Sequence, residues 1–326
     1  MLYYFNHIIK KKVNYMENNT SLNAVHQDET ADSNYHDLVN NFEITYKITL
    51  PTEQLNALIH YHECFEIIFY ISANIEAYID DIHYDLHSQD VLIVPPRKLH
   101  KIIYPEKQNY IRYVFYFTEE HIKNAFSPTM VKKALNLFLN RSYQKASLSV
   151  SDFIRINSLF FNMYYHKSQF SSANLYLLNT YSSVILQELY VIFKNQPAYE
   201  KSETDMSPVE QILKYINGHY SEDISLEDFE KIFYLDKSYI CRVFRKTMGI
   251  SLVNYLQHKR ILEAQQLLLN STESIIDISL ECGFNNIQHF YRVFKKVTHV
   301  TPNEFKKHRT SSVLGQSFVP LVNPNK

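Results

Sequence analysis

A short sequence occurs twice in the last third of this chain, at a constant offset. The first copy, SYICRVFRKTMGISLVNYL, begins at Ser238, and the second, QHFYRVFKKVTHVTPNEFK, begins at Gln288. Arg242 aligns with Arg292, so the offset is 292 − 242 = 50 residues. A fixed period is typical of a duplicated supersecondary unit. We therefore expect residues 207–310 to form one all-α domain that contains two related units.

Each copy has the residues that a pair of helices needs at its helix starts. Residues with N-cap side chains recur at matching places, namely Ser225, Asp236, Ser274 and Asn286. Asp228 and Asp277 follow the two serines by three residues, which resembles a capping box with Asp in the Glu role. The pattern predicts two helices joined by a turn in each copy, that is, two helix-turn-helix units.

The second helix of each expected unit has one apolar face and one polar, basic face. Ile240, Val243 and Phe244 form the apolar stripe in the first copy, and Phe290, Val293 and Phe294 form it in the second. Arg and Gln suit guanine and adenine edges in a major groove, and Lys or Arg one turn later suits phosphates. The candidate DNA-binding residues are therefore Ser238, Cys241, Arg242, Arg245, Gln288, Tyr291, Arg292 and Lys295.

A long amphipathic helix is expected between the two copies, from about Leu252 to Leu269. At ~1.5 Å per residue its length is nearly 30 Å. A rigid spacer of that reach would set two recognition helices about 34 Å, or one DNA turn, apart. One chain would then read two successive major grooves.

Length and charge limit the alternatives. A chain of 326 residues is long enough for two domains with tails. The net charge of −1 excludes a polycation, so any DNA contact must come from a local basic patch. Three widely spaced cysteines form no metal-ligand pattern, which favours a reduced cytoplasmic compartment. No apolar run is long enough to cross a bilayer, so no membrane partner is expected.

The N-terminal part is predicted to be a polar tail followed by an antiparallel β-barrel. Residues 1–40 lack periodicity and are expected to be disordered or loosely attached, and Met16 is a second possible start. From Phe42 to Leu50 apolar residues alternate strictly, which indicates a half-buried strand. Short strands follow at close spacing through 41–118, in CFEIIFYIS, IEAYI, IHYDL, DVLIVP, HKIIY and YIRYVFYFT. Such spacing without helices between favours an antiparallel sandwich or barrel.

Residues 119–196 then change to a helical period. One apolar stripe runs from Phe153 to Tyr164 and another from Leu175 to Ile192, and both are broad enough to pack on the barrel and on a second copy of the chain. We expect a helical pair that forms a homodimer. The proline-bracketed polar segment 197–206 is the expected linker, and 311–326 is a tail.

The segment from Ser207 to Arg309 resembles the DNA-binding domain of the AraC/XylS family of bacterial transcription regulators. The resemblance is most specific in its second half, at Asp277, Ile278, Gly283, Phe284, Phe290, Arg292, Phe294, Lys295, Thr301, Pro302 and Phe305. It implies base contacts at Ser238, Cys241 and Arg242 in the first unit and at Gln288, Tyr291 and Arg292 in the second. It also implies a cupin-like N-terminal sensor domain and a small effector.

The first unit departs from the family pattern more than the second. Glu230 stands where the family usually has a small residue, and Phe233-Tyr234 replaces a smaller residue followed by Gly. In the second unit, His299 replaces a Gly. Bulk at 230 and 234 would tilt the first recognition helix, so the second is the better-supported reader.

The barrel segment carries a pattern that resembles the metal motif of cupins. HYHECFE reads H-x-H-x3-E, and PPRKLH adds a later His, with Arg97 where Gly is usual. His60, His62, Glu66 and His100 could hold Fe, Mn, Ni or Zn. Alternatively these residues line an effector pocket or fill a core, together with Tyr61, Phe65, Phe69, Tyr78 and Tyr113. The second reading is preferred, so we expect no cofactor and no catalytic residue.

Three functions are compatible with these features. The leading one is a sequence-specific transcription regulator that binds promoter DNA and meets RNA polymerase, under the control of an effector or partner acting on the barrel. A cupin-type metal-binding enzyme fused to a DNA-binding domain is the alternative. A DNA-alkylation repair protein would need a nucleophilic Cys in a basic setting, and Cys64 lies in an acidic apolar strand.

Overall fold

The computed structural model describes residues 42–49, 59–105, 110–140, 142, 144–168, 172–197 and 202–307. The expected tails at 1–40 and 311–326 lie outside the described residues, as do parts of the expected linker and the last residues of the expected DNA-binding domain. Within the described ranges, no helix is long and apolar enough to cross a membrane.

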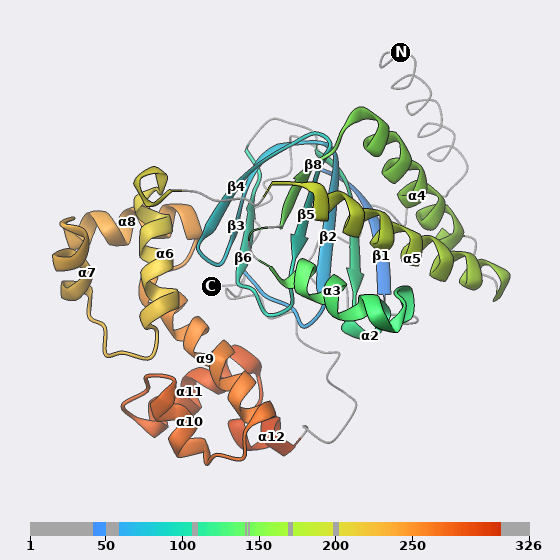
Figure 1. The fold of residues 1–326 in the computed structure, drawn as a ribbon. Coiled ribbons are helices and arrows are strands. Elements are labelled where there is room, and N and C mark those ends of the chain that lie inside the picture. Colours follow the sequence, from blue (N-terminus) through green and yellow to red (C-terminus); the bar gives the residue numbers. More distant parts are fainter. Residues whose placement is uncertain are drawn as a thin grey trace. The chain divides into compact units, whose positions relative to one another are not determined.

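The N-terminal strands form two antiparallel sheets (Figure 1). The larger sheet has the order β1-β7-β2-β5-β8, and the smaller has the order β4-β3-β6. The strands that the sequence predicts are all present, at β1 (Phe42–Thr49), β2 (Phe65–Ser72), β3 (Asn74–Ile79), β4 (Ile82–His87), β5 (Asp90–Val94), β6 (His100–Ile103) and β7 (Tyr110–Phe117). The antiparallel assignment of the strands is therefore confirmed.

The expectation of a closed barrel is wrong. Strands β1 and β8 are the edges of the larger sheet, and neither pairs with the β4-β3-β6 sheet. β3 instead takes β4 and β6 as its two partners. Alternation along a strand indicates that it is a strand, but it does not specify which edge meets which neighbour.

The central strand β2 of the larger sheet has buried residues on both of its faces. Phe65, Ile67 and Phe69 of β2 pack in one core with the helices that follow the sheet. Since side chains alternate along a strand, Glu66 and its neighbours Ile68 and Tyr70 point to the opposite face. Those three are buried as well. β2 therefore places a carboxylate inside the protein.

Residues 119–196 are mostly helical, in α2 (Glu119–Ala125), α3 (Pro128–Leu139), α4 (Val150–Ser168) and α5 (Ser172–Asn195). The prediction that this segment is helical throughout is wrong at β8 (Lys145–Ser147), a short strand that pairs with β5. Three residues are too few to show a strand or helix period in the sequence. They form a strand because they pair with the edge of β5.

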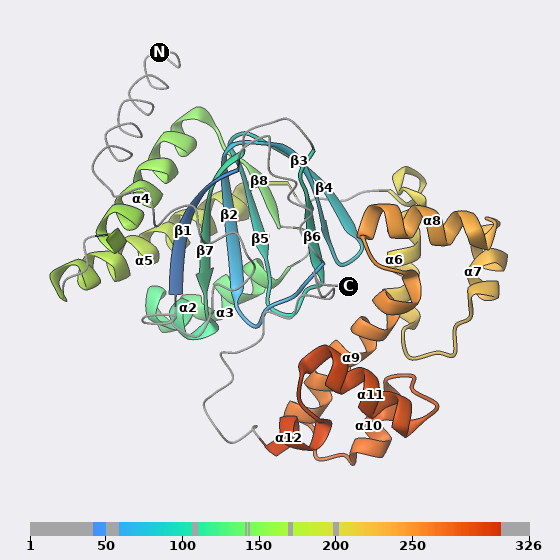
Figure 2. The same cartoon turned by 180° about the vertical axis from the view of Figure 1, so that it is seen from behind.

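Helices α4 and α5 run antiparallel beside the larger sheet (Figures 1 and 2). Arg155 and Glu188 form an ion pair of 3.0 Å, and at the other end His166 Nδ1 lies 2.9 Å from Asn174 Oδ1. The predicted stripes on both helices supply buried residues to the same core as the sheet, including Ile156, Phe160, Ile185 and Leu189. The helical pair is thus held on the sheet by a shared apolar core.

The C-terminal part is all helical. After a short 3-10 turn (Glu203–Asp205) come α6 (Pro208–His219), α7 (Leu226–Phe233), α8 (Lys237–Met248), α9 (Leu252–Asn270), α10 (Ile275–Glu281), α11 (Ile287–Thr298) and α12 (Pro302–Lys307). The bounds of α8 and α11 differ by 50 residues at both ends, as the repeat predicts. The caps also form as predicted, since Ser225, Asp236, Ser274 and Asn286 each accept a hydrogen bond from a backbone N–H of the following helix.

The linking helix α9 differs from its prediction in one respect. It begins at Leu252 as expected, but it is not a simple amphipathic spacer. Its buried residues lie around much of its circumference, at Leu252, Tyr255, Leu256, His258, Lys259, Ile261, Leu262, Ala264, Gln265 and Leu268. α9 contacts α8 as well as α10, α11 and α12, so several helices cover it at once. A helix that other helices cover on several sides has no continuous polar face, so its sequence does not show a simple amphipathic pattern.

Burial of His258 on α9 predicts a loss of stability in acid. Burial, with Lys296 nearby, lowers the pKa of His258 from 6.5 to about 4. Between these values the unfolded chain binds a proton at this site and the folded chain does not. The free energy of unfolding therefore falls as the pH falls from 6.5 towards 4, by about 3 kcal/mol from this residue.

The measurement is urea unfolding of the wild type and of His258→Leu at pH 7 and pH 4. We expect the wild type to lose about 3 kcal/mol more than the variant between the two pH values. His121 on α2, whose pKa burial also lowers to about 4, is common to both proteins and cancels in the comparison. Equal losses in the two proteins would show that His258 is not held neutral by the fold.

Candidate nucleic-acid interface and sensor cluster

The predicted DNA-binding residues lie on accessible faces of α8 and α11. In both helices the apolar stripe is buried, with Ile240, Phe244, Phe290 and Phe294 at 0% exposure. On the opposite faces six of the predicted residues are exposed and two are half-buried. The exposed ones are Ser238, Arg242, Arg245, Gln288, Arg292 and Lys295, and the half-buried ones are Cys241 and Tyr291. Both faces are therefore free to meet a ligand.

Two of these side chains have local contacts that orient them. The guanidinium carbon of Arg242 lies 5.8 Å from the centre of the Tyr239 ring on the same helix. The Tyr291 hydroxyl accepts a hydrogen bond of 3.0 Å from Asn303 Nδ2 on α12. The sequence pattern did not indicate Asn303, because its contact with α11 depends on how α12 folds back. Asn303 is a positioning residue for the second face.

The two helix pairs use the same turn geometry with different residues. Tyr234 has a left-handed backbone, φ 54°, at the place where the second pair has Gly283 with φ 82°. After the second helices the roles are reversed, because Gly249 has φ 79° and His299 has φ 64°. The departures noted at Tyr234 and His299 therefore keep the left-handed turn rather than replace it.

The departure at Glu230 is also accommodated. Its counterpart in the second pair is Ser279, which is buried and donates a hydrogen bond of 2.8 Å to the Ile276 carbonyl oxygen. Glu230 is half-buried, and α7 and α8 are in contact.

In the N-terminal sheets, His62, Glu66 and His100 come together. One ligand atom of each lies within 4.8 Å of the others, and all three residues are buried. His62 Nε2 is 3.2 Å and His100 Nε2 is 3.4 Å from the same Glu66 oxygen, Oε2. Burial by itself would lower the pKa of His62, but contacts with Cys64 and Glu66 raise it to about 10. Burial would raise the pKa of Glu66, yet its interactions with the His100 and His62 rings hold it well below its usual range.

The other members of the predicted pocket lie elsewhere. The His60 ring is 4.1 Å from that of His100, but His60 is outside the group of three ligand atoms. Tyr78 packs in an apolar cluster with residues of α6, α8 and α9 and lies outside the group of three ligand atoms. Phe65, Phe69 and Tyr113 belong to the core beneath α4 and α5. All four of these aromatic side chains are buried in apolar clusters.

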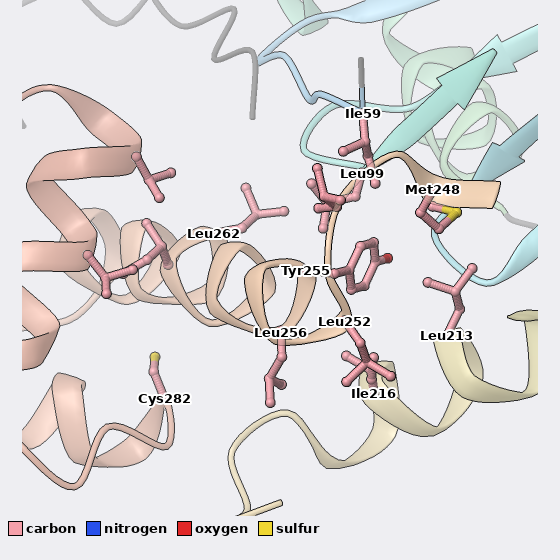
Figure 3. Packing of buried hydrophobic residues seen from close by; sticks show 14 of the residues in the cluster. Ile59, Leu99, Leu213, Ile216, Met248, Leu252, Tyr255, Leu256, Leu262 and Cys282 are labelled. Carbon is pink, nitrogen blue, oxygen red and sulfur yellow. The ribbon is translucent and has the colours of Figure 1, made fainter. Parts of the chain in front are cut away.

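The strand and loop that hold the histidines also contact α9. Tyr61 donates a hydrogen bond of 2.7 Å to Gln265 Oε1, and Arg97 donates one of 2.6 Å to Gln266 Oε1. Ile59 and Leu99 lie in one apolar cluster with residues of the C-terminal helices, among them Leu213, Ile216, Met248, Leu252 and Tyr255 (Figure 3). The sequence did not predict these contacts of Gln265 and Gln266, because their partners, Tyr61 and Arg97, are far away in the sequence.

Cys64 does not have the setting of a catalytic nucleophile. It is 7% exposed and lies directly before β2, whose apolar residues are buried. A DNA-repair thiol needs access to its substrate, and the Cys64 side chain is buried.

Comparison with known proteins identifies the C-terminal part. A family model described as a helix-turn-helix domain matches residues 231–308. The transcriptional activator RhaR of Mannheimia succiniciproducens is 25% identical over 251 residues, which are 76% of this chain and 86% of RhaR. The activator RhaS of an Enterobacter species is 26% identical over 126 residues, or 39% of this chain and 45% of RhaS. This chain thus spans less than half the length of RhaS in that match.

A solved structure with a broad match is that of ToxT from Vibrio cholerae O395. It is 12% identical and covers 83% of this chain and 99% of its own, with a TM-score of 0.33.

The helix pairs and the matching domain model define a helix-turn-helix DNA-binding protein. The chain is a homologue of the AraC-family regulators RhaR and RhaS, and its last helices form a DNA-binding domain of the AraC type. It is therefore a DNA-binding transcription regulator.

Proposed function

We propose that this regulator reads DNA with two helix-turn-helix units, α7–α8 and α10–α11, and that α8 and α11 enter successive major grooves. The observation that carries the proposal is the repetition of an exposed basic face at equivalent positions of two equivalent helices. Arg242 and Arg292 occupy the same place in each helix and are both exposed. Arg at such a place suits the O6 and N7 atoms of guanine.

Exposed cations one turn further along each helix have a different role in this proposal. Arg245 and Lys295 are exposed and lie in the last turns of α8 and α11. We assign them to phosphates, which position the helix without reading sequence. α9 contacts α8, α10 and α11, so it sets the spacing of the two readers.

The N-terminal sheets form the cupin-like sensor in this proposal, and α4 and α5 form the homodimer contact. α5 exposes large apolar side chains beyond those it packs on the sheet, with Tyr176 at 78% and Val191 at 52%. Exposed apolar residues on neighbouring helices are typical of an interaction surface. We place the regulator in the cytoplasm. An effector or partner acting on the sheets would change how the dimer presents its DNA-binding helices to promoter DNA and to RNA polymerase.

The alternative of a cupin-type enzyme draws no support from the relatives, which are regulators. Metal binding by the sheets would not by itself make the chain an enzyme, because function depends on the site and not on the fold.

Selection of bound sequences from a random DNA library tests the proposed function. We expect the full chain, as a homodimer, to enrich a motif made of two pairs of half-sites, with the half-sites within a pair about one DNA turn, or ~10 base pairs, apart. A fragment of residues 201–326 should enrich one such pair with an affinity at least about tenfold lower, because the avidity of a dimer is lost. A motif with a single half-site per chain would rule out two readers. A fragment that binds as tightly as the full chain would rule out a role for dimerisation.

A further inference from the structure

His62 and His100, the two histidines that meet at Glu66, have fixed ring orientations. His62 Nδ1 lies 2.8 Å from the carbonyl oxygen of Cys64, and His100 Nδ1 lies 2.8 Å from that of Lys98. A carbonyl oxygen accepts hydrogen bonds, so each Nδ1 must carry the proton. In the neutral ring the other nitrogen, Nε2, then has a lone pair to offer. Both Nε2 atoms lie within 3.4 Å of Glu66 Oε2.

This arrangement calls for a positive charge at its centre. Two lone pairs and a carboxylate that converge without one repel each other, and burial increases the cost because little water screens them. All three residues are at most 5% exposed. Among the described residues, no group meets His100 Nε2 with the geometry of a hydrogen bond, although this atom is buried and lies 3.4 Å from Glu66 Oε2. The positive charge can come from protons on the rings or from a metal ion among the three ligands.

We propose that His62, Glu66 and His100 bind a divalent first-row transition-metal ion and that this ion is the effector of the regulator. Two nitrogens and one carboxylate are the ligand set of mononuclear iron and zinc sites with open positions. Ligands about 2.1 Å from one ion lie no more than ~4.2 Å apart, so a small contraction of the 4.8 Å cluster closes the site. The two carbonyl oxygens at Nδ1 are the outer partners that metal-binding histidines typically have.

The role as effector rests on the proposed function and on how the ligands are connected to α9. His62 follows Tyr61, which donates a hydrogen bond to Gln265, and His100 follows Leu99, which packs with the C-terminal helices. The two segments are joined by backbone hydrogen bonds between His60 and His100 of 3.0 and 2.9 Å. Drawing His62 and His100 onto an ion therefore shifts the residues that hold α9. α9 in turn contacts both recognition helices.

Titration of the full-length chain with Co²⁺ and Zn²⁺, after removal of metal with a chelator, tests the site. We expect about one equivalent of Co²⁺ to bind with a visible d–d absorption, and Zn²⁺ to displace it. Glu66→Gln and His100→Gln, which keep nearly the same volume, should each bind at least about tenfold more weakly. His87→Gln on β4 is the matched control, because the side chain of His87 is 62% exposed and lies outside the cluster. Less than about a tenth of an equivalent bound to the wild type would overturn the site, as would unchanged binding in both cluster variants.

The effector role has its own measurement. The affinity for the selected DNA should differ at least about fivefold between the metal-free and the metal-loaded wild type, and it should not respond to metal in His100→Gln. One equivalent of bound metal with no change in DNA affinity would overturn the effector role. Arg292→Ala should lose DNA affinity and keep the Co²⁺ spectrum. A failure of the DNA-reading proposal is thereby separated from a failure of the metal site.

Discussion

Gly283→Ala should lower the free energy of unfolding by about 3 kcal/mol, with the loss in the C-terminal helices. Gly283 has φ 82°, and a Cβ built there would lie 2.8 Å from the backbone oxygen and 2.9 Å from the backbone carbon of Ser221. A left-handed residue with a Cβ costs ~1–2 kcal/mol, and forcing extra volume into a packed place costs ~1–3 kcal/mol more. Backbone atoms cannot move aside as the end of a side chain can. Urea unfolding followed by circular dichroism measures the loss.

Tyr234→Ala is the matched control for this prediction. Tyr234 occupies the same turn in the first helix pair, already has a left-handed backbone with φ 54°, and is 92% exposed. Removing its side chain should change the free energy of unfolding by no more than ~0.5 kcal/mol. A loss in Gly283→Ala no larger than that in Tyr234→Ala would show that neither the left-handed backbone nor the contact with Ser221 requires glycine at 283.

Removing Arg242 and Arg292 together should weaken binding to the selected DNA site by about 2–6 kcal/mol, as the sum of two base contacts of ~1–3 kcal/mol each. Both guanidinium groups lie on exposed faces, so each substitution leaves the helix core intact. The two residues are on separate helices with no shared partner, and their effects should add. Fluorescence anisotropy with the selected site and with random DNA measures both affinities.

The single variants and one control complete this experiment. Each single Arg→Ala variant should lose affinity for the selected site and little for random DNA. Lys295→Ala should weaken both by a similar factor, because a phosphate contact carries no sequence information. Lys123→Ala on α2 removes an exposed charge outside the DNA-binding helices and should change neither affinity. If Arg242→Ala has no effect on the selected site, only the second helix pair reads bases. Equal losses on random DNA would assign Arg292 to a phosphate.

Much of the DNA-binding part could be predicted from the sequence because its determinants are local. N-cap residues such as Asp236 and Asn286 satisfy backbone donors a few residues away, and the apolar stripe of α8 recurs within one helix. The duplication strengthened the prediction, since each feature appears twice, at an offset of 49 residues for Ser225 and Ser274 and of 50 for Asp236 and Asn286. The H-x-H-x3-E pattern together with the later His100 likewise indicated four residues, and His62, Glu66 and His100 come together in the fold. His60 is the one that the fold leaves outside.

The alternation and helical periods of this chain determined its strands, its recognition helices and their exposed basic faces, because these depend on interactions within a few residues. Only the tertiary structure decided that the sheets stay open, that β8 joins β5, that Tyr78 packs against the C-terminal helices and that Tyr61 reaches Gln265. Each of these joins residues far apart in the chain. The free energy of such a contact depends on which surfaces the whole fold leaves uncovered, and no short stretch of sequence contains that information.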